Sequence, residues 1–135
     1  MSRTAIYTAN TSAQNVAVNG VISPGTIVRR FGQGLGLSGN AVQISCPGYY
    51  DIDASITVAP TAIGNVTVSL LKDGVPVQGA TATAAVATAN DPTNLKISSL
   101  IRENCACCEG LSNLTFVLTG TASSVTNIAV VAEKI

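Results

Sequence analysis

The segment from Tyr49 to Ala59 constrains the fold more than any other part of the sequence. Its even-numbered residues from Tyr50 to Val58 are apolar, whereas its odd-numbered residues from Asp51 to Thr57 are polar. Side chains of a β-strand point alternately to the two faces of a sheet. The pattern therefore predicts a strand with one face in the core and the other at the surface.

Similar runs recur along the chain, separated by turn-forming Gly, Pro, Asn and Asp residues, and helix-favouring patterns are nearly absent. Asp73-Gly74 has the composition of a tight hairpin turn that leads into Val75-Pro76-Val77. We predict ten strands: Arg3–Ala9, Asn15–Val18, Thr26–Phe31, Ala41–Ser45, Tyr49–Ala59, Asn65–Lys72, Ala80–Ala89, Asn94–Arg102, Leu111–Thr119 and Val125–Lys134. The expected fold is an all-β antiparallel sandwich or barrel. Residues 1–135 form its single domain, and residues 1–4 are a short N-terminal segment.

The last strand predicts an oligomer. Ile128 to Ala132 are apolar on both faces of the strand, whereas a sheet with one wet face would alternate. Charged residues make up only 10% of the chain, and seven basic residues balance seven acidic ones. Because a weakly charged, neutral surface tends to associate, a neighbouring subunit is the simplest cover for the second face.

The composition argues against catalysis and against several classes of partner. The chain has no His, which removes the usual general base and the commonest metal ligand. The neutral charge excludes a basic surface for nucleic acid or for an anionic membrane, and no apolar run reaches the roughly 18 residues of a membrane span. Asp51 and Asp53 share a strand face about 7 Å apart, and they are candidates for calcium. A solvated outer face is the preferred interpretation of this pair.

One glycine-rich segment, Gly32-Gln33-Gly34-Leu35-Gly36, is similar in composition to a phosphate-binding loop. No helix follows it, and no Lys-Ser/Thr pair accompanies it. We therefore interpret it as a flexible loop between strands.

The stretch from Val42 to Ile52 resembles a motif of the tumour-necrosis-factor and complement-type jelly rolls. It reads Val-Gln-Ile-Ser-Cys-Pro-Gly-Tyr-Tyr-Asp-Ile, and Leu35 lies seven residues before it. The resemblance implies a ten-stranded antiparallel jelly-roll sandwich that forms a homotrimer. It also implies that the sheet containing the Tyr50 strand faces the threefold axis. Tyr50, Ile52, Ile128 and Val130 are then candidates for the core or the trimer interface, and parity alone does not separate the two.

The jelly-roll order also brings the four cysteines to one end of the molecule. The strand that starts near Tyr49 pairs antiparallel with Asn94–Arg102, so Cys46 lies near Cys105, Cys107 and Cys108. Free thiols or a disulfide are the preferred interpretation. Zinc is the alternative, although these cysteines depart from the usual spacing of structural zinc ligands. No cofactor is expected beyond these zinc and calcium possibilities.

Within the family that this chain resembles, the bacterial and phage members are the most similar in sequence character. We therefore expect a non-enzymatic virion structural protein, a trimeric decoration or head-fibre protein on a bacteriophage capsid. The alternative is the trimeric head of a collagen-like spore- or cell-surface protein acting in adhesion or display. Only Met1 to Thr4 precede the first strand, which favours the virion interpretation. The expected partners are the major capsid protein, docked through Arg3, Thr4, Gly34 or Leu35, and host surface carbohydrate.

Overall fold

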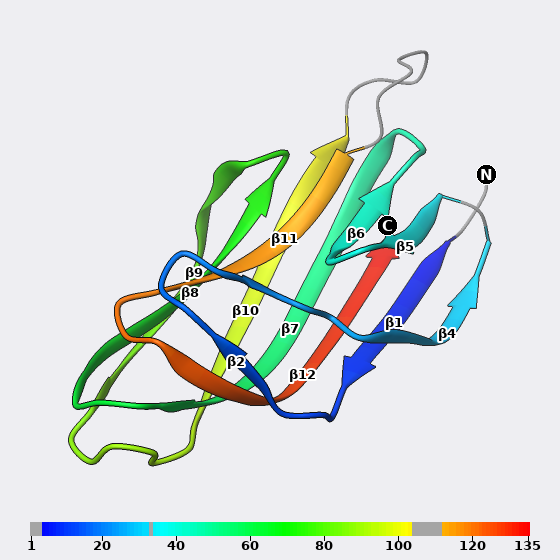
Figure 1. Ribbon diagram of the computed structural model, residues 1–135. Helices are drawn as coiled ribbons and strands as arrows, with labels where there is room; N and C mark the ends of the chain where they lie inside the picture. The colour runs from blue at the N-terminus through cyan, green and yellow to red at the C-terminus, as the bar shows by residue number, and fades with distance from the viewer. Residues whose placement is uncertain (1–3, 33, 104–111) are drawn as a thin grey trace.

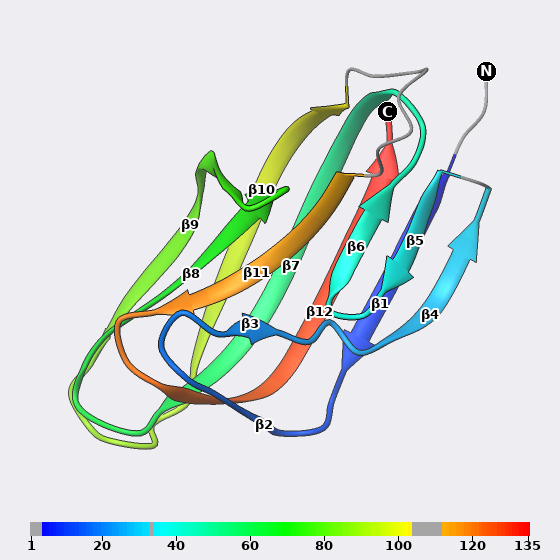
Figure 2. The ribbon, with the colours of Figure 1, turned by 45° about the horizontal axis from the view of Figure 1, so that its top comes forward.

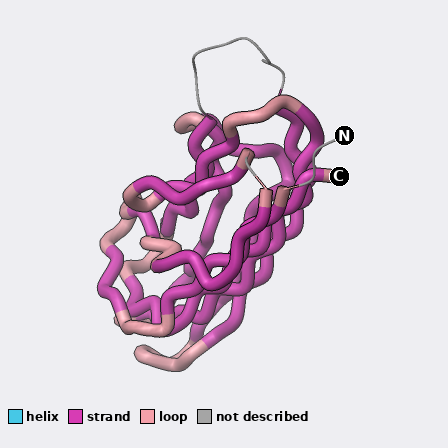
Figure 3. Tube along the Cα trace, turned by 90° about the vertical axis from the view of Figure 1, so that its right-hand side faces the viewer, coloured by secondary structure: helices cyan, strands magenta, loops and turns pink. Residues whose placement is uncertain are grey.

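The computed structural model describes residues 4–32, 34–103 and 112–135, and these residues form two antiparallel β-sheets packed face to face. Figure 1 shows the strands of the two sheets running diagonally, and Figure 3 shows the two layers from the side. The expectation of an all-β antiparallel sandwich is confirmed.

The first layer, called sheet A, has its first and last strands side by side. Its path runs β10 (Thr93–Glu103), β7 (Gly48–Pro60), β12 (Ser123–Lys134), β1 (Ala5–Asn10) and β4 (Thr26–Phe31). The short strand β2 (Gln14–Val16) pairs with the beginning of β12. The C-terminal strand β12 therefore lies in the middle of sheet A, between β7 and β1.

The second layer, called sheet B, covers the inner face of sheet A. Its path runs β5 (Leu35–Ser38), β6 (Ala41–Ile44), β11 (Ser112–Thr119), β8 (Gly64–Lys72) and β9 (Val75–Val86). The two-residue strand β3 (Val21–Ile22) pairs with β11. β8 and β9 form a hairpin whose turn has positive φ at both Asp73 (52°) and Gly74 (83°). The predicted tight Asp-Gly turn is confirmed.

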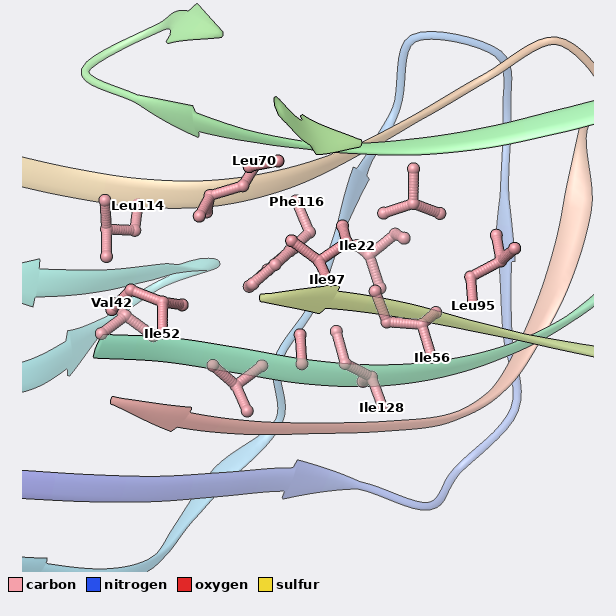
Figure 4. Packing of buried hydrophobic residues seen from close by; sticks show 14 of the residues in the cluster. Ile22, Val42, Ile52, Ile56, Leu70, Leu95, Ile97, Leu114, Phe116 and Ile128 are labelled. Carbon is pink, nitrogen blue, oxygen red and sulfur yellow. The ribbon is translucent and has the colours of Figure 1, made fainter. Parts of the chain in front are cut away.

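The core consists of the apolar residues that the two sheets direct toward each other. Figure 4 shows Ile52, Ile56 and Ile128 of sheet A meeting Leu70 and Phe116 of sheet B. All five side chains are buried, and Tyr50 is the largest buried side chain. Burial of such side chains stabilises the fold by about 1.5–3 kcal/mol each.

The described residues form twelve strands, so the prediction of ten was wrong. The two additional strands are β3 and β5, which are only two and four residues long. β5 lies inside the glycine-rich segment that we interpreted as a flexible loop, and its Leu35 pairs with Ile44 of β6. Glycines at alternate positions hide the apolar alternation there, because only Leu35 and Leu37 carry apolar side chains. β9 is continuous from Val75 to Val86, whereas we expected the hairpin turn to lead into residues 75–77 and a separate strand to begin at Ala80.

Candidate interaction surface

The outer face of sheet A is formed by the residues that alternate with the core residues along each strand. One row crosses four strands, because Tyr7 of β1 lies opposite Val131 of β12, which lies opposite Asp53 of β7. Asp53 in turn lies opposite Ser98 of β10. Tyr7 is 37% exposed and Val131 is 40% exposed. The centre of this face is therefore apolar and open to solvent.

Further apolar side chains surround this row on the same face. Phe31 lies opposite Ala5 at one edge, and Leu100 lies opposite Asp51 at the other. Tyr49 stands two residues before Asp51, and the guanidinium of Arg102 lies 5.8 Å from the centre of its ring. Phe31, Tyr49 and Leu100 are all exposed. An exposed apolar patch spread over several strands is typical of a protein-binding surface.

The outer face of sheet B has a different character. Hydroxyl groups line its β8 and β9 strands, where Thr67 Oγ1 and Thr83 Oγ1 lie 2.9 Å apart. Ser69 Oγ and Thr81 Oγ1 form a second pair at 3.3 Å. These hydroxyls bond to each other, so they need no protein cover. The outer face of sheet B also exposes Val21, which lies opposite Val117, but its β8 and β9 strands are polar. The more extensive apolar face of sheet A is therefore the candidate interaction surface.

In the part of this surface that the structure describes, two hollows lie one on each side of Tyr7 and Val131, which line both. The larger has a volume of about 590 Å³ and also contacts Asp53, Lys96 and Ser98. The smaller, of about 160 Å³, lies against β4. Ser98 Oγ donates a hydrogen bond to Asp53 Oδ1 within the larger hollow. The polar groups of the larger hollow are thus partly hydrogen-bonded within the chain. A partner would cover mainly the apolar groups of this hollow.

The structure places the four predicted core or interface residues in the core. Tyr50, Ile52, Ile128 and Val130 are all buried between the sheets. The Tyr50 hydroxyl donates a hydrogen bond to the backbone oxygen of Cys46 at 2.7 Å. Burial raises the pKa of Tyr50 to about 12, and the nearby Cys46 and Glu103 add to that shift. In the single chain these side chains do not reach the surface.

Sequence reasoning missed the residues that form the surface itself, above all Tyr7, Leu100 and Val131. The doubly apolar last strand contained the signal for Val131. Once Ile128 and Val130 are assigned to the core, strand parity directs Ala129 and Val131 outward. Tyr7 and Leu100 lie in predicted strands, but only the pairing register shows that they share this face.

Three of the four predicted docking residues do not present side chains at the surface. Thr4, Gly34 and Leu35 are all buried. Thr4 Oγ1 donates to the backbone oxygen of Phe31 at 3.1 Å, and Gly34 O accepts a hydrogen bond from Ser45 N at 2.9 Å. These groups hold β4 and β5 to the rest of the sandwich. Arg3 lies outside the described residues.

The predicted metal-binding residues are only partly described. Cys105, Cys107 and Cys108 lie outside the described residues, while Cys46 is half-buried just before β7. The antiparallel pairing of β7 with β10 is confirmed, since Gly48 lies opposite Glu103. Asp51 and Asp53 share the outer face of sheet A, as their spacing predicts.

Within residues 4–32, 34–103 and 112–135, no group of three or more Cys, Asp or Glu side chains could hold a metal ion. The same residues contain no helix that is long and apolar enough to cross a membrane.

Comparison with known proteins gives the same fold type for each similar solved structure. No family model matches the sequence, and no curated protein sequence matches it. Among solved structures, vertex protein P5 of phage PRD1 is similar, with a TM-score of 0.66 and 21% identity over 98% of this chain and 96% of that one.

Two animal proteins are similar over equally long stretches. Murine APRIL at pH 8.0 gives a TM-score of 0.72 at 10% identity, covering 98% of this chain and 99% of that one. The globular domain of zebrafish complement 1qA gives 0.65 at 7% identity, covering 97% and 95%. The chain therefore has the jelly-roll fold of the tumour-necrosis-factor and C1q type.

Proposed function

We propose that this protein is a non-enzymatic structural protein of a bacteriophage virion, where it acts as a homotrimer docked on the capsid. The likeness to a phage vertex protein over nearly the whole of both chains supports the virion role. The fold type implies the trimer. A symmetric plug of this kind suits threefold positions on an icosahedral lattice, where it bridges neighbouring capsid subunits.

The single observation that carries the proposal is the apolar outer face of sheet A. Tyr7 and Val131 form its exposed centre, and the two hollows beside them can receive side chains of a neighbouring copy. A stable protein interface buries at least about 1,000 Å² in total. The outer face of sheet A extends across five paired strands.

The trimer is tested by light scattering at micromolar concentration, with Val131→Glu as the disrupting variant. A carboxylate at the centre of the interface would be desolvated without a partner, so we expect the mass to fall from three chains to one. Val117→Glu is the matched control, because Val117 lies on the outer face of sheet B, opposite Ser69. A wild-type mass of one chain refutes the trimer, and so does equal dissociation by both variants.

The virion role is tested separately by mass spectrometry of purified particles encoded by the same genome. We expect the chain in intact particles, at a fixed ratio to the major capsid protein. Gentle treatment that strips docked proteins should release it as a trimer. If the chain is absent from the particles, the proposed virion role is wrong even where the trimer is confirmed.

A further inference from the structure

The strand β4 forms an edge of sheet A with unusual exposure. It pairs with β1 on one side, and within the described residues no strand pairs with its other side. All six of its residues are exposed. They include Ile27 at 41%, Val28 at 52% and Phe31 at 60%. Figure 2 shows β4 at the outer side of the sandwich, where its free edge faces solvent.

The same edge carries two adjacent positive charges. Arg29 lies opposite Tyr7 and so belongs to the outer face of sheet A, whereas Arg30 lies opposite the buried Ile6 and belongs to the other side. The paired strand β1 has no charged residue. Among the described residues neither guanidinium has an ion-pair partner. The edge thus holds unneutralised positive charge on both sides of the sheet.

An apolar hollow lies directly beside this edge. It has a volume of about 160 Å³, and Ala5, Tyr7, Phe31 and Val131 line it together with the two arginines. A strand added to β4 would place side chains alternately above and below the sheet. Those on the outer side would lie next to this hollow.

We propose that the free edge of β4 binds an extended segment of a partner protein by strand addition. The segment carries two adjacent acidic residues between apolar ones. Unpaired backbone groups on a sheet edge are a template for such pairing. Adjacent residues of an added strand point to opposite sides, so one acidic residue reaches Arg29 and the next reaches Arg30. The site shares the smaller hollow with the outer face of sheet A, but its backbone contacts lie at the free edge of β4, and it does not depend on the virion role.

Two alternative explanations of the β4 edge fit these residues less well: pairing with β4 of a second copy, and protection of the edge from aggregation. A second copy of this chain pairing β4 with β4 would bring four arginines together, and like charges on paired strands repel. Charged residues often protect an edge from aggregation. That protective role does not require three exposed large apolar side chains on the same six-residue strand.

The test is titration of the whole protein with synthetic peptides, followed by fluorescence anisotropy. The probe is an eight-residue peptide with two adjacent glutamates flanked by valines. We expect saturable binding that weakens with added salt. A peptide with lysines in place of the glutamates should not bind. Two further peptides carry N-methyl groups on every second backbone amide, one on the odd-numbered residues and one on the even-numbered residues. Only one of them should lose binding, because the amides of only one alternating set face β4.

The matched protein variants separate charge from fold. Arg29→Glu combined with Arg30→Glu should weaken binding of the glutamate peptide by at least about tenfold and favour the lysine peptide. Lys72→Glu on β8 should leave binding unchanged.

Light scattering distinguishes failure here from failure of the proposed trimer. Arg30→Glu alone, which leaves the outer face of sheet A unaltered, should weaken binding of the glutamate peptide while the mass stays that of the wild type. The proposal is overturned if the glutamate peptide does not bind. It is also overturned if both N-methylated sets bind equally, or if the double variant binds as the wild type does.

Discussion

Replacing Thr8 with valine should stabilise the protein, because this threonine buries a hydroxyl group without a partner. Thr8 lies in the middle of β1 and is 0% exposed. Its Oγ1 atom has no hydrogen-bond partner among the described residues. An unpaired buried hydroxyl costs about 1–3 kcal/mol, and the added methyl group buries further apolar surface. Valine keeps the β-branched shape, so we expect the free energy of unfolding to rise by about 1–2 kcal/mol.

The assay is urea denaturation followed by circular dichroism, at one fixed protein concentration because oligomers unfold in a concentration-dependent way. Thr4→Val is the matched control. Thr4 is equally inaccessible at 3% exposure, but its hydroxyl donates to the backbone oxygen of Phe31. That variant should lose about 1 kcal/mol, because it removes a satisfied hydrogen bond. The reasoning is refuted if Thr8→Val destabilises the protein, or if the two substitutions have the same sign.

Two further predictions concern other parts of the sandwich. Tyr50 ionises at about pH 12 in the folded chain and near its ordinary pKa of 10.0 when unfolded. The free energy of unfolding should therefore fall as the pH rises from about 10 to about 12. Tyr50→Phe should remove that part of the slope in denaturation curves, and an unchanged slope would contradict the assignment. Gly120 and Gly74 both have positive φ, at 91° and 83°. A Cβ atom at Gly120 would clash with the backbone oxygen of Asn65, whereas a Cβ atom at Gly74 would meet no atom within 4 Å. Gly74→Ala should cost about 1–2 kcal/mol in thermal melts and Gly120→Ala clearly more, and equal losses would contradict the steric argument.

The long strands could be predicted from the sequence because their apolar periodicity extends over many residues. β7 and β12 have the clearest patterns, and the buried residues Tyr50, Ile52, Ile128 and Val130 follow them. Two of the short strands, β3 and β5, could not be predicted. β3 has two residues, and β5 has glycine at the position between its two leucines, so neither contains enough alternation to distinguish a strand from a loop.

The candidate interaction surface could be predicted only in part. The sequence indicates that β12 is apolar on both faces, but it does not indicate which strands lie beside it. Tyr7 and Val131 are more than a hundred residues apart in the chain, yet they are directly paired. Register between distant strands depends on the packing of the whole sandwich, which no local pattern contains.

The position of β12 has a consequence for the order in which the molecule can form during synthesis. Sheet A contains β1 and β7, which are made early, but the strand that joins them is the last of the twelve to be synthesised. Until residues 123–134 leave the ribosome, the chain holds two separate pieces of one sheet, both with unpaired edges. Folding of sheet A must therefore wait for β12 and then proceed through pairings between distant segments, which are slow to form. A premature stop just before Ser123 would remove the centre of the sheet.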